Sequence, residues 1–205
     1  MELSQAIRER RSIRKYKKEE PPKAVIEKIM EEGLWAPSTT NQQPWHFYIV
    51  RGADKDKLAH IISPAGQVIL PKLERAFRDK PKVIQSTLEF FNTLGGAPIL
   101  ICCYSQSSPV TAQPDSTPTY LRTCNIDRLG KIQSVSAAIQ NILLSAHAAG
   151  LGTCWMTAPL HVADDINRTL GMGDGELVAL VTMGYAEGTA AIPPRKEGKL
   201  SWIGF

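Results

Sequence analysis

The 205-residue chain lacks the motifs that mark several common active sites. It has no G-x-G-x-x-G sequence and no Walker lysine pattern, so neither a Rossmann dinucleotide site nor a P-loop is supported. No serine stands in a G-x-S-x-G elbow, no histidine pair has metal-ligand spacing, and no carboxylate pair stands out as acid and base. If the chain is an enzyme, we expect a cofactor, and not a metal or a catalytic side chain, to carry the chemistry.

Long apolar runs are also missing. No run reaches the length of a membrane span, and the N-terminal sequence MELSQAIRERR is charged and lacks the apolar stretch of a signal peptide. The four cysteines form no C-x-x-C pair, and Cys102 and Cys103 lie in an apolar run typical of a buried strand. We therefore expect a cytoplasmic protein whose cysteines, including Cys124 and Cys154, are reduced thiols of the core.

The formal net charge is only +4, but cations gather near the N-terminus: Arg8, Arg10, Arg11, Arg14, Lys15, Lys17 and Lys18. With the hydroxyl of Ser12, the guanidinium groups match the donors that a phosphate requires. A solvated basic helix end is the simpler interpretation, and composition alone favours it. Nucleic-acid binding ranks far behind, because Tyr16 is the one aromatic residue within this cluster.

Two loops contain further candidate binding positions, which are polar side chains in the first loop and glycines in the second. Residues 36–45 offer neutral hydrogen-bonding side chains suited to a polyol or a heterocycle edge, although a turn-forming loop explains them equally well. Gly150 and Gly152 allow close backbone approach. The four scattered histidines, His46, His60, His147 and His161, are expected to be structural.

Periodicity predicts helices over 3–11, 25–34, 132–146 and 161–170, and strands over 46–50, 97–104, 153–156 and 177–184. The helix at 132–146 is small and apolar, so it should be central. Two or three helical stretches, broken by prolines, are expected between 53 and 95. The segment 105–128 has no periodicity, which indicates a lid or a disordered loop, and the tail looks extended. No repeat or linker divides the chain, and irregular alternation favours one α+β layered domain over 1–205.

Four stretches in this order are similar to one known family: RRSIRKY, APSTTNQQPWHFYIV, GLGTCWM and PPRK. The chain resembles the nitroreductase family of FMN enzymes. This resemblance implies a central, mostly antiparallel sheet flanked by helices, and a homodimer with FMN at the subunit interface. It also implies that the C-terminal tail extends onto the partner subunit.

The resemblance assigns roles residue by residue. Arg10, Ser12 and Arg14 match positions that grip the FMN phosphate and the pyrimidine edge of the ring, Arg11 would add ribityl or phosphate contacts, and Arg195 matches a second phosphate cation. The loop residues Pro37, Ser38, Thr39 and Asn41 would reach the flavin of the other subunit. Trp155, Thr157 and Ala158 align with the stretch along the ring, where relatives often have proline, glutamate and glycine, and Gln67 matches a flavin-contacting amide.

The implied reaction is ping-pong. NADH or NADPH reduces FMN and leaves, and a nitroaromatic, quinone or related small-molecule acceptor is then reduced. Arg14 would stabilise the reduced ring near N1 and O2. A flavin reductase, an ene-reductase and a non-catalytic FMN store or sensor are the alternatives.

Overall fold

The computed structural model describes residues 1–106, 116–172 and 175–204. Its centre is a four-stranded sheet in the order β1 (Trp45–Arg51), β2 (Ile99–Ser105), β4 (Glu176–Gly184), β3 (Gly152–Met156). All three neighbouring pairs are antiparallel, which confirms the expected kind of sheet. Every residue of β2 is buried, as the unbroken apolar run predicts.

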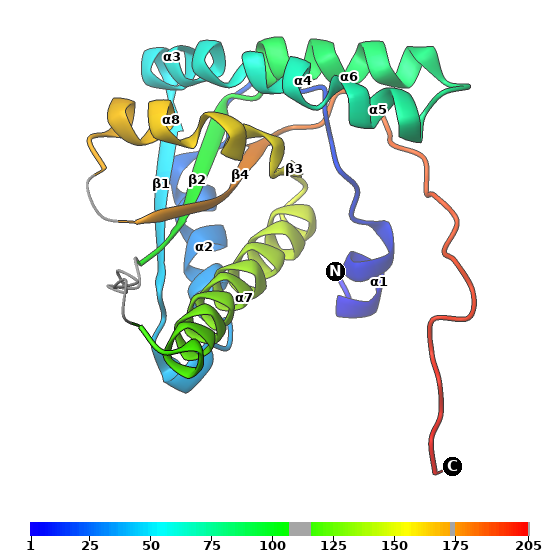
Figure 1. The fold of residues 1–205 in the computed structure, drawn as a ribbon. Helices are drawn as coiled ribbons and strands as arrows, with labels where there is room; N and C mark the ends of the chain where they lie inside the picture. The colour runs from blue at the N-terminus through cyan, green and yellow to red at the C-terminus, as the bar shows by residue number, and fades with distance from the viewer. Residues whose placement is uncertain (107–115, 173–174, 205) are drawn as a thin grey trace.

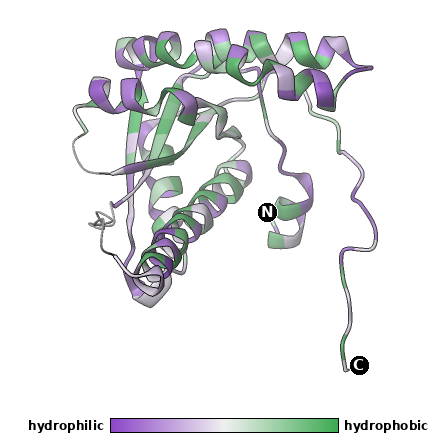
Figure 2. Cartoon of the chain, viewed as in Figure 1, coloured by the Kyte–Doolittle hydropathy of each residue, from purple (hydrophilic) through white to green (hydrophobic). Residues whose placement is uncertain are grey.

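Helices cover both faces of the sheet (Figure 1). Successive residues of β2 join clusters on opposite sides of the sheet. Leu100 and Cys102 join a cluster with residues of α3 (Gly52–Ile62) and α6 (Pro81–Thr93). Ile99 and Ile101 join a second cluster with α2 (Lys23–Leu34) and α7 (Pro118–Ala148). Figure 2 shows the strands mostly in the colour of hydrophobic residues, between helices of mixed hydropathy. The layered α+β prediction is therefore confirmed.

The region 53–95 differs from the sequence-based expectation. It forms four α-helices, which are α3, α4 (Pro64–Val68), α5 (Leu70–Ala76) and α6, followed by a short 3₁₀ turn. The prolines divide the region as predicted, and they do so by starting the next helix. Each of Pro64, Pro71 and Pro81 lies in the first turn of a helix, where the missing N–H costs no hydrogen bond.

The expectation of a structureless 105–128 segment was wrong for its second part, because α7 already begins at Pro118. The side chain of Thr117 caps this helix by accepting a hydrogen bond from the Tyr120 N–H. The outer half of α7 leaves Leu121 and Ile126 exposed, so it carries no apolar stripe facing this chain's core. Residues 107–115 lie outside the described part of the chain.

Smaller differences concern the ends of helices and one cysteine. Helix α1 (Leu3–Glu9) ends before Arg10, and the predicted helix at 161–170 is a 3₁₀ turn, η3 (Ala158–Val162), followed by α8 (Ala163–Leu170). Cys124 is half-buried on the outer half of α7 and is not a core thiol, whereas the other three cysteines are buried and all four are free.

Residues 188–204 run as an extended tail away from the layers (Figure 1). The apolar side chains of Ile192, Leu200, Trp202 and Ile203 are exposed there. Among the described helices, none is long and apolar enough to span a membrane.

Candidate functional site

The basic segment, residues 10–16, runs in extended form beside β3. Ser12 forms an isolated parallel bridge with Thr153, and the Ile13 N–H donates to the Thr153 carbonyl at 2.9 Å. Glycine is required at Gly152, because a Cβ there would lie 2.6–2.9 Å from three side-chain atoms of Ile13. The segment can lie this close to the strand because Gly152 has no side chain.

The far end of the basic segment is fixed by Tyr16 and Gly95. The Tyr16 N–H donates to the Gly95 carbonyl at 3.0 Å, and a Cβ on Gly95 would lie 2.1 Å from the Arg14 carbonyl oxygen. The buried hydroxyl of Tyr16 lies 2.7 Å from the Ile13 carbonyl and 2.7 Å from the Thr182 hydroxyl. Burial raises the pKa of Tyr16, so the phenol stays protonated and serves as a permanent anchor.

Arg14 lines a cavity of about 360 Å³, which we call the Arg14 cavity. Its other walls come from the end of β3 and from the helices α5, α6 and η3: Ile69, Lys72, Leu73, Ala76, Phe77, Thr87, Phe90, Phe91, Cys154, Trp155, Met156, Thr157, Ala158 and His161. Burial raises the pKa of the Cys154 thiol, while the nearby Arg14 and Arg10 guanidinium groups act in the opposite direction. Cationic donors and aromatic rings thus face one space, which suits a planar, electron-rich ligand.

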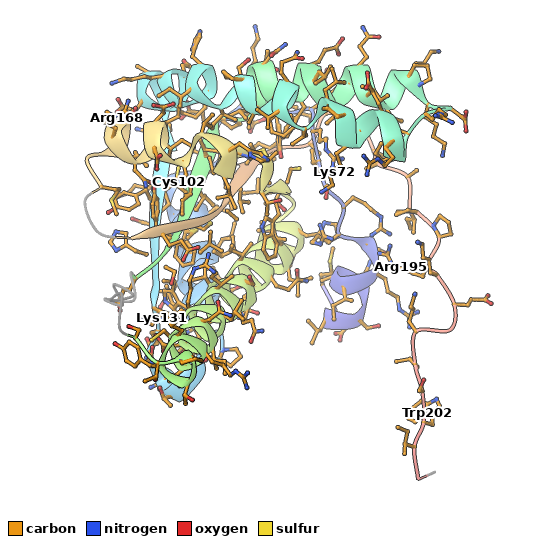
Figure 3. All side chains as sticks on the ribbon, viewed as in Figure 1. Lys72, Cys102, Lys131, Arg168, Arg195 and Trp202 are labelled. Carbon is orange, nitrogen blue, oxygen red and sulfur yellow. The ribbon has the colours of Figure 1, made fainter. Side chains whose placement is uncertain are left out.

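Arg10 and Arg11 line a second cavity of about 410 Å³, which we call the Arg10 cavity. It lies among α1, the end of α7, the start of β3 and the first residues of the tail. Burial lowers the pKa of Arg10, and the positive charges of Arg11 and Arg195 lower it further. A bound anion would relieve this repulsion. Figure 3 labels Arg195 on the tail beside α1.

Three residues that line the Arg10 cavity each carry a buried side-chain atom without a hydrogen-bond partner among the described residues. Arg11 Nε, His147 Nε2 and Thr153 Oγ1 are buried and unpaired. Burial lowers the pKa of His147; Glu9 raises it, and Arg10 and Arg11 lower it.

The two cavities lie at opposite ends of a short stretch of chain. Residues 10 to 14 are five extended residues, which span at most roughly 16–18 Å, and Ser12 lies between their ends. A phosphate end at Arg10 and a ring end at Arg14 would match an elongated ligand with an anionic tail. The donor set therefore fits FMN. Among the described residues, no group of His, Cys, Asp or Glu is arranged to hold a metal.

A larger hollow, about 680 Å³, lies elsewhere, between α2 and the edge strand β1. None of the predicted site residues lines it, and its walls are chiefly apolar. We place the site at the arginines, because charge and unpaired donors specify a ligand more strongly than volume does.

The loop at Pro37–Asn41 packs on α7 and lines neither arginine cavity. The Thr39 N–H donates to the Ser134 hydroxyl at 3.2 Å, and Ser38 accepts from the Gln43 N–H at 3.0 Å. Thr40 and Asn41 have positive φ values of 48° and 55°, so the loop holds an unusual backbone shape. One chain does not bring this loop to its own basic segment.

Gln67 is not brought to the cavity either. Its side chain is exposed on α4 and lines neither arginine cavity, whereas Ile69 and Lys72 further along do line the Arg14 cavity. Sequence reasoning missed Lys72 and His161. In the sequence, Lys72 follows a proline and His161 lies in a predicted helix, and neither residue belongs to a motif. Figure 3 shows Lys72 on the helix that faces the basic segment.

The fold and the paired arginine cavities define a protein that holds an elongated anionic cofactor beside a sheet edge. The family model for the nitroreductase family matches residues 7–185. This chain belongs to the nitroreductase family.

Individual relatives agree with this assignment. A protein of Methanothermobacter thermautotrophicus named for NADH dehydrogenase and NAD(P)H nitroreductase activity is 30% identical over 76% of this chain, and the match spans only 60% of that relative. The nitroreductase NfnB of Mycolicibacterium smegmatis is 26% identical, covering 94% of this chain and 88% of the relative. Iodotyrosine deiodinase 1 of Mus musculus is 28% identical over 98% of this chain and 68% of its own length.

Solved structures share the whole fold. A BluB-like flavoprotein from Clostridium difficile has a TM-score of 0.78 and 28% identity, covering 99% of both chains. A nitroreductase from Bacteroides fragilis with bound FMN has a TM-score of 0.71 at 21% identity, over 99% of both chains. NfnB from Mycobacterium smegmatis in complex with NADPH has a TM-score of 0.70 at 19% identity, over 98% and 97% of the two chains. The last two likenesses concern the fold alone.

Proposed function

We propose that this chain is an FMN-dependent oxidoreductase that takes reducing equivalents from NADH or NADPH and delivers them to a nitroaromatic, quinone or related conjugated acceptor. Family membership supports the class of enzyme. The observation that carries the proposal is the position of the basic segment. It is held against β3, with the Arg10 cavity, which suits a phosphate, at one end and the Arg14 cavity, which suits a planar ring, at the other.

The residues of one chain would divide the binding of FMN as follows. Arg10, Ser12 and Arg195 would hold the phosphate, and Arg11 would add a donor at the same end. Arg14 would face the pyrimidine edge of the ring, where positive charge favours the anionic reduced form. FMN supplies the hydride acceptor and donor that no side chain of this chain provides.

The stretch after β3 would run along the ring. Trp155, Thr157 and Ala158 line the Arg14 cavity as the resemblance implies. Among the described residues, the buried indole N–H of Trp155 has no hydrogen-bond partner. The phenylalanines of α6 would exclude water from the same space.

A second copy of the chain would complete each site. The loop of Pro37, Ser38, Thr39 and Asn41 lines neither arginine cavity of its own chain, which is consistent with a place against a partner's flavin. The tail exposes apolar side chains that dimerisation would cover. We expect a homodimer with FMN at the interface, and the cytoplasmic location stays a prediction.

A ping-pong scheme, in which the oxidised nicotinamide leaves before the acceptor binds, requires one cavity to serve both substrates in turn. The Arg14 cavity is the candidate, because it adjoins the predicted ring position and is open to solvent. A flavin reductase or ene-reductase would use the same cavity. A storage or sensor protein would bind FMN without turnover.

Anaerobic reduction of the FMN-loaded protein tests the proposal. NADH or NADPH should bleach the oxidised flavin band, and a nitroaromatic or quinone added afterwards should restore it. Because deiodinases are among the relatives, an iodinated phenol should be tested beside these acceptors. A protein that binds FMN but is reduced by neither nucleotide would contradict the enzyme assignment and support storage or sensing.

A further inference from the structure

The Arg14 cavity has basic side chains in its walls and no acidic ones. Arg14, Lys72 and His161 line it, and its lining contains neither aspartate nor glutamate. All three residues are exposed, and none of them forms an ion pair within the part of the chain that the structure describes. The proposed function places Arg14 at the flavin ring, which leaves the lysine and the histidine without a role.

Lys72 lies on the side of α5 that faces the cavity. The wall residues from this helix and from the residue before it stand at positions i, i+3, i+4 and i+7, which share one side of a helix: Ile69, Lys72, Leu73 and Ala76. Lys72 is the one polar member of this apolar stripe. Glu74, the one carboxylate of α5, lines a different hollow. The helix therefore presents its lysine to the cavity and its carboxylate elsewhere (Figure 3 labels Lys72).

His161 reaches the same cavity from η3. It stands three residues after Ala158, and side chains three residues apart on a 3₁₀ turn lie on the same side. An imidazole donates a hydrogen bond in either protonation state and gains a positive charge when protonated. The carboxylates that follow in sequence, Asp164 and Asp165, lie in the first turn of α8 and do not line the cavity.

The inner wall of the cavity is apolar and aromatic. Phe90 and Phe91 are buried there, with ring centroids 5.9 Å apart and an edge-to-face arrangement. Such a wall accepts the flat conjugated part of any acceptor, whether charged or neutral. The basic side chains beside it distinguish the two, because they attract an acidic substituent that a neutral acceptor of the same shape lacks.

We propose that Lys72 and His161 bind a carboxylate on the acceptor, so that the enzyme prefers nitroaromatic or quinone carboxylates to neutral acceptors of the same shape. The inference rests on the proposed function, because it names the class of acceptor that the Arg14 cavity takes. The carboxylate accepts hydrogen bonds from the Lys72 ammonium and the His161 imidazole. Neither residue lies in the four stretches that carry the family resemblance, so both are specificity residues particular to this chain's variable middle and η3 turn.

The test compares 4-nitrobenzoate with 4-nitrobenzamide, which have nearly the same shape and differ in charge. Lys72→Met keeps most of the length of the side chain without its ammonium, and His161→Leu removes the imidazole donors. The matched controls are Lys82→Met on α6 and His60→Leu on α3, which are exposed and line neither arginine cavity. Steady-state kinetics give kcat/KM for each acceptor, and the ratio of variant to native cancels the different reactivities of the two nitro groups.

Each site variant should lower kcat/KM for 4-nitrobenzoate roughly three- to tenfold, as the loss of a solvent-exposed charged contact predicts. The value for 4-nitrobenzamide and the affinity for FMN should not change, and both controls should behave as the native chain does. Added salt should reduce the native preference for the acid. Equal losses for the two acceptors, or weaker FMN binding in both variants, would overturn the proposal. A loss confined to reduction by NADPH would also contradict it, since Lys72 and His161 would then meet the nucleotide's phosphate.

Binding without turnover gives a second measurement, on the native protein. Benzoate has no group that reduced flavin attacks, so it can be titrated while the absorption of bound FMN and the imidazole NMR signals of His161 are recorded. Benzoate should shift both, benzamide should do so only at higher concentration, and the signals of His60 should not move. If the protein binds no FMN or neither nucleotide reduces it, the proposed function fails, and the NMR titration still decides the inference. If the flavin turns over without preference for the acid, the inference alone fails.

Discussion

Replacing Gly152 with alanine should weaken FMN binding more than it weakens the fold. The added Cβ would lie 2.6–2.9 Å from three side-chain atoms of Ile13. Real Cβ atoms do not tolerate such contacts, so the basic segment must move away from β3. The movement would stretch the 2.9 Å hydrogen bond from Ile13 to Thr153 and displace Ser12, which pairs with the same residue.

Two terms set the expected change in the free energy of unfolding. Overpacking costs about 1–3 kcal/mol, and replacing glycine returns about 0.5–1 kcal/mol through the unfolded chain. A net loss of roughly 0–2.5 kcal/mol remains. If one hydrogen bond to the phosphate is lost as well, FMN affinity should fall roughly ten- to a hundredfold.

Gly33→Ala is the matched control. Its Cβ would lie 2.5 Å from Ile142 Cγ1, so it strains the packing of α2 on α7, away from the arginine cavities. Helix propensity returns about 1 kcal/mol at this position. Urea unfolding should show a similar or smaller loss of stability, and FMN titration should show no change in affinity. A Gly152→Ala protein that loses stability but keeps its FMN affinity would refute the reasoning.

Three further predictions use single side chains. Arg14→Gln should lower the two-electron potential of bound FMN by roughly 30–60 mV, if the lost interaction is worth about 1.5–3 kcal/mol; an unchanged potential in spectroelectrochemical titration would exclude Arg14 from the ring. Ellman's reagent should modify half-buried Cys124 in the folded protein and spare buried Cys102, whose pKa burial raises to about 12; peptide mapping that finds Cys102 labelled first would contradict the fold. Burial lowers the pKa of His147 in the folded protein below the value of about 6.5 that holds in the unfolded chain. Just below pH 6.5 the unfolded state therefore binds more protons, so the free energy of unfolding should fall as the pH drops through that window of about one unit. In urea titrations at several pH values, His147→Gln should reduce this pH dependence.

The centre of the sheet was predictable because β2 and β4 are buried on both faces. An unbroken apolar run such as 99–103 has few alternatives to a central strand. The basic segment was also predictable, since its arginines are close in sequence and match a family motif. The pairing of Ser12 with Thr153 was not predictable, because it joins residues far apart in the chain.

The errors have a common physical cause. The outer half of α7 and the helix α5 face solvent for much of their length, so they show no apolar period. Lys72 was missed for this reason, although it lines the Arg14 cavity. The unpaired atoms of His147 and Thr153 could not be predicted, because only the folded chain brings the end of α7 to β3.

The most direct test of the central claim is the absorption spectrum of the purified protein, followed by identification of the chromophore that heat releases. The account predicts oxidised-flavin bands and FMN in the supernatant, at one molecule per chain. A colourless protein that also fails to bind added FMN would contradict it.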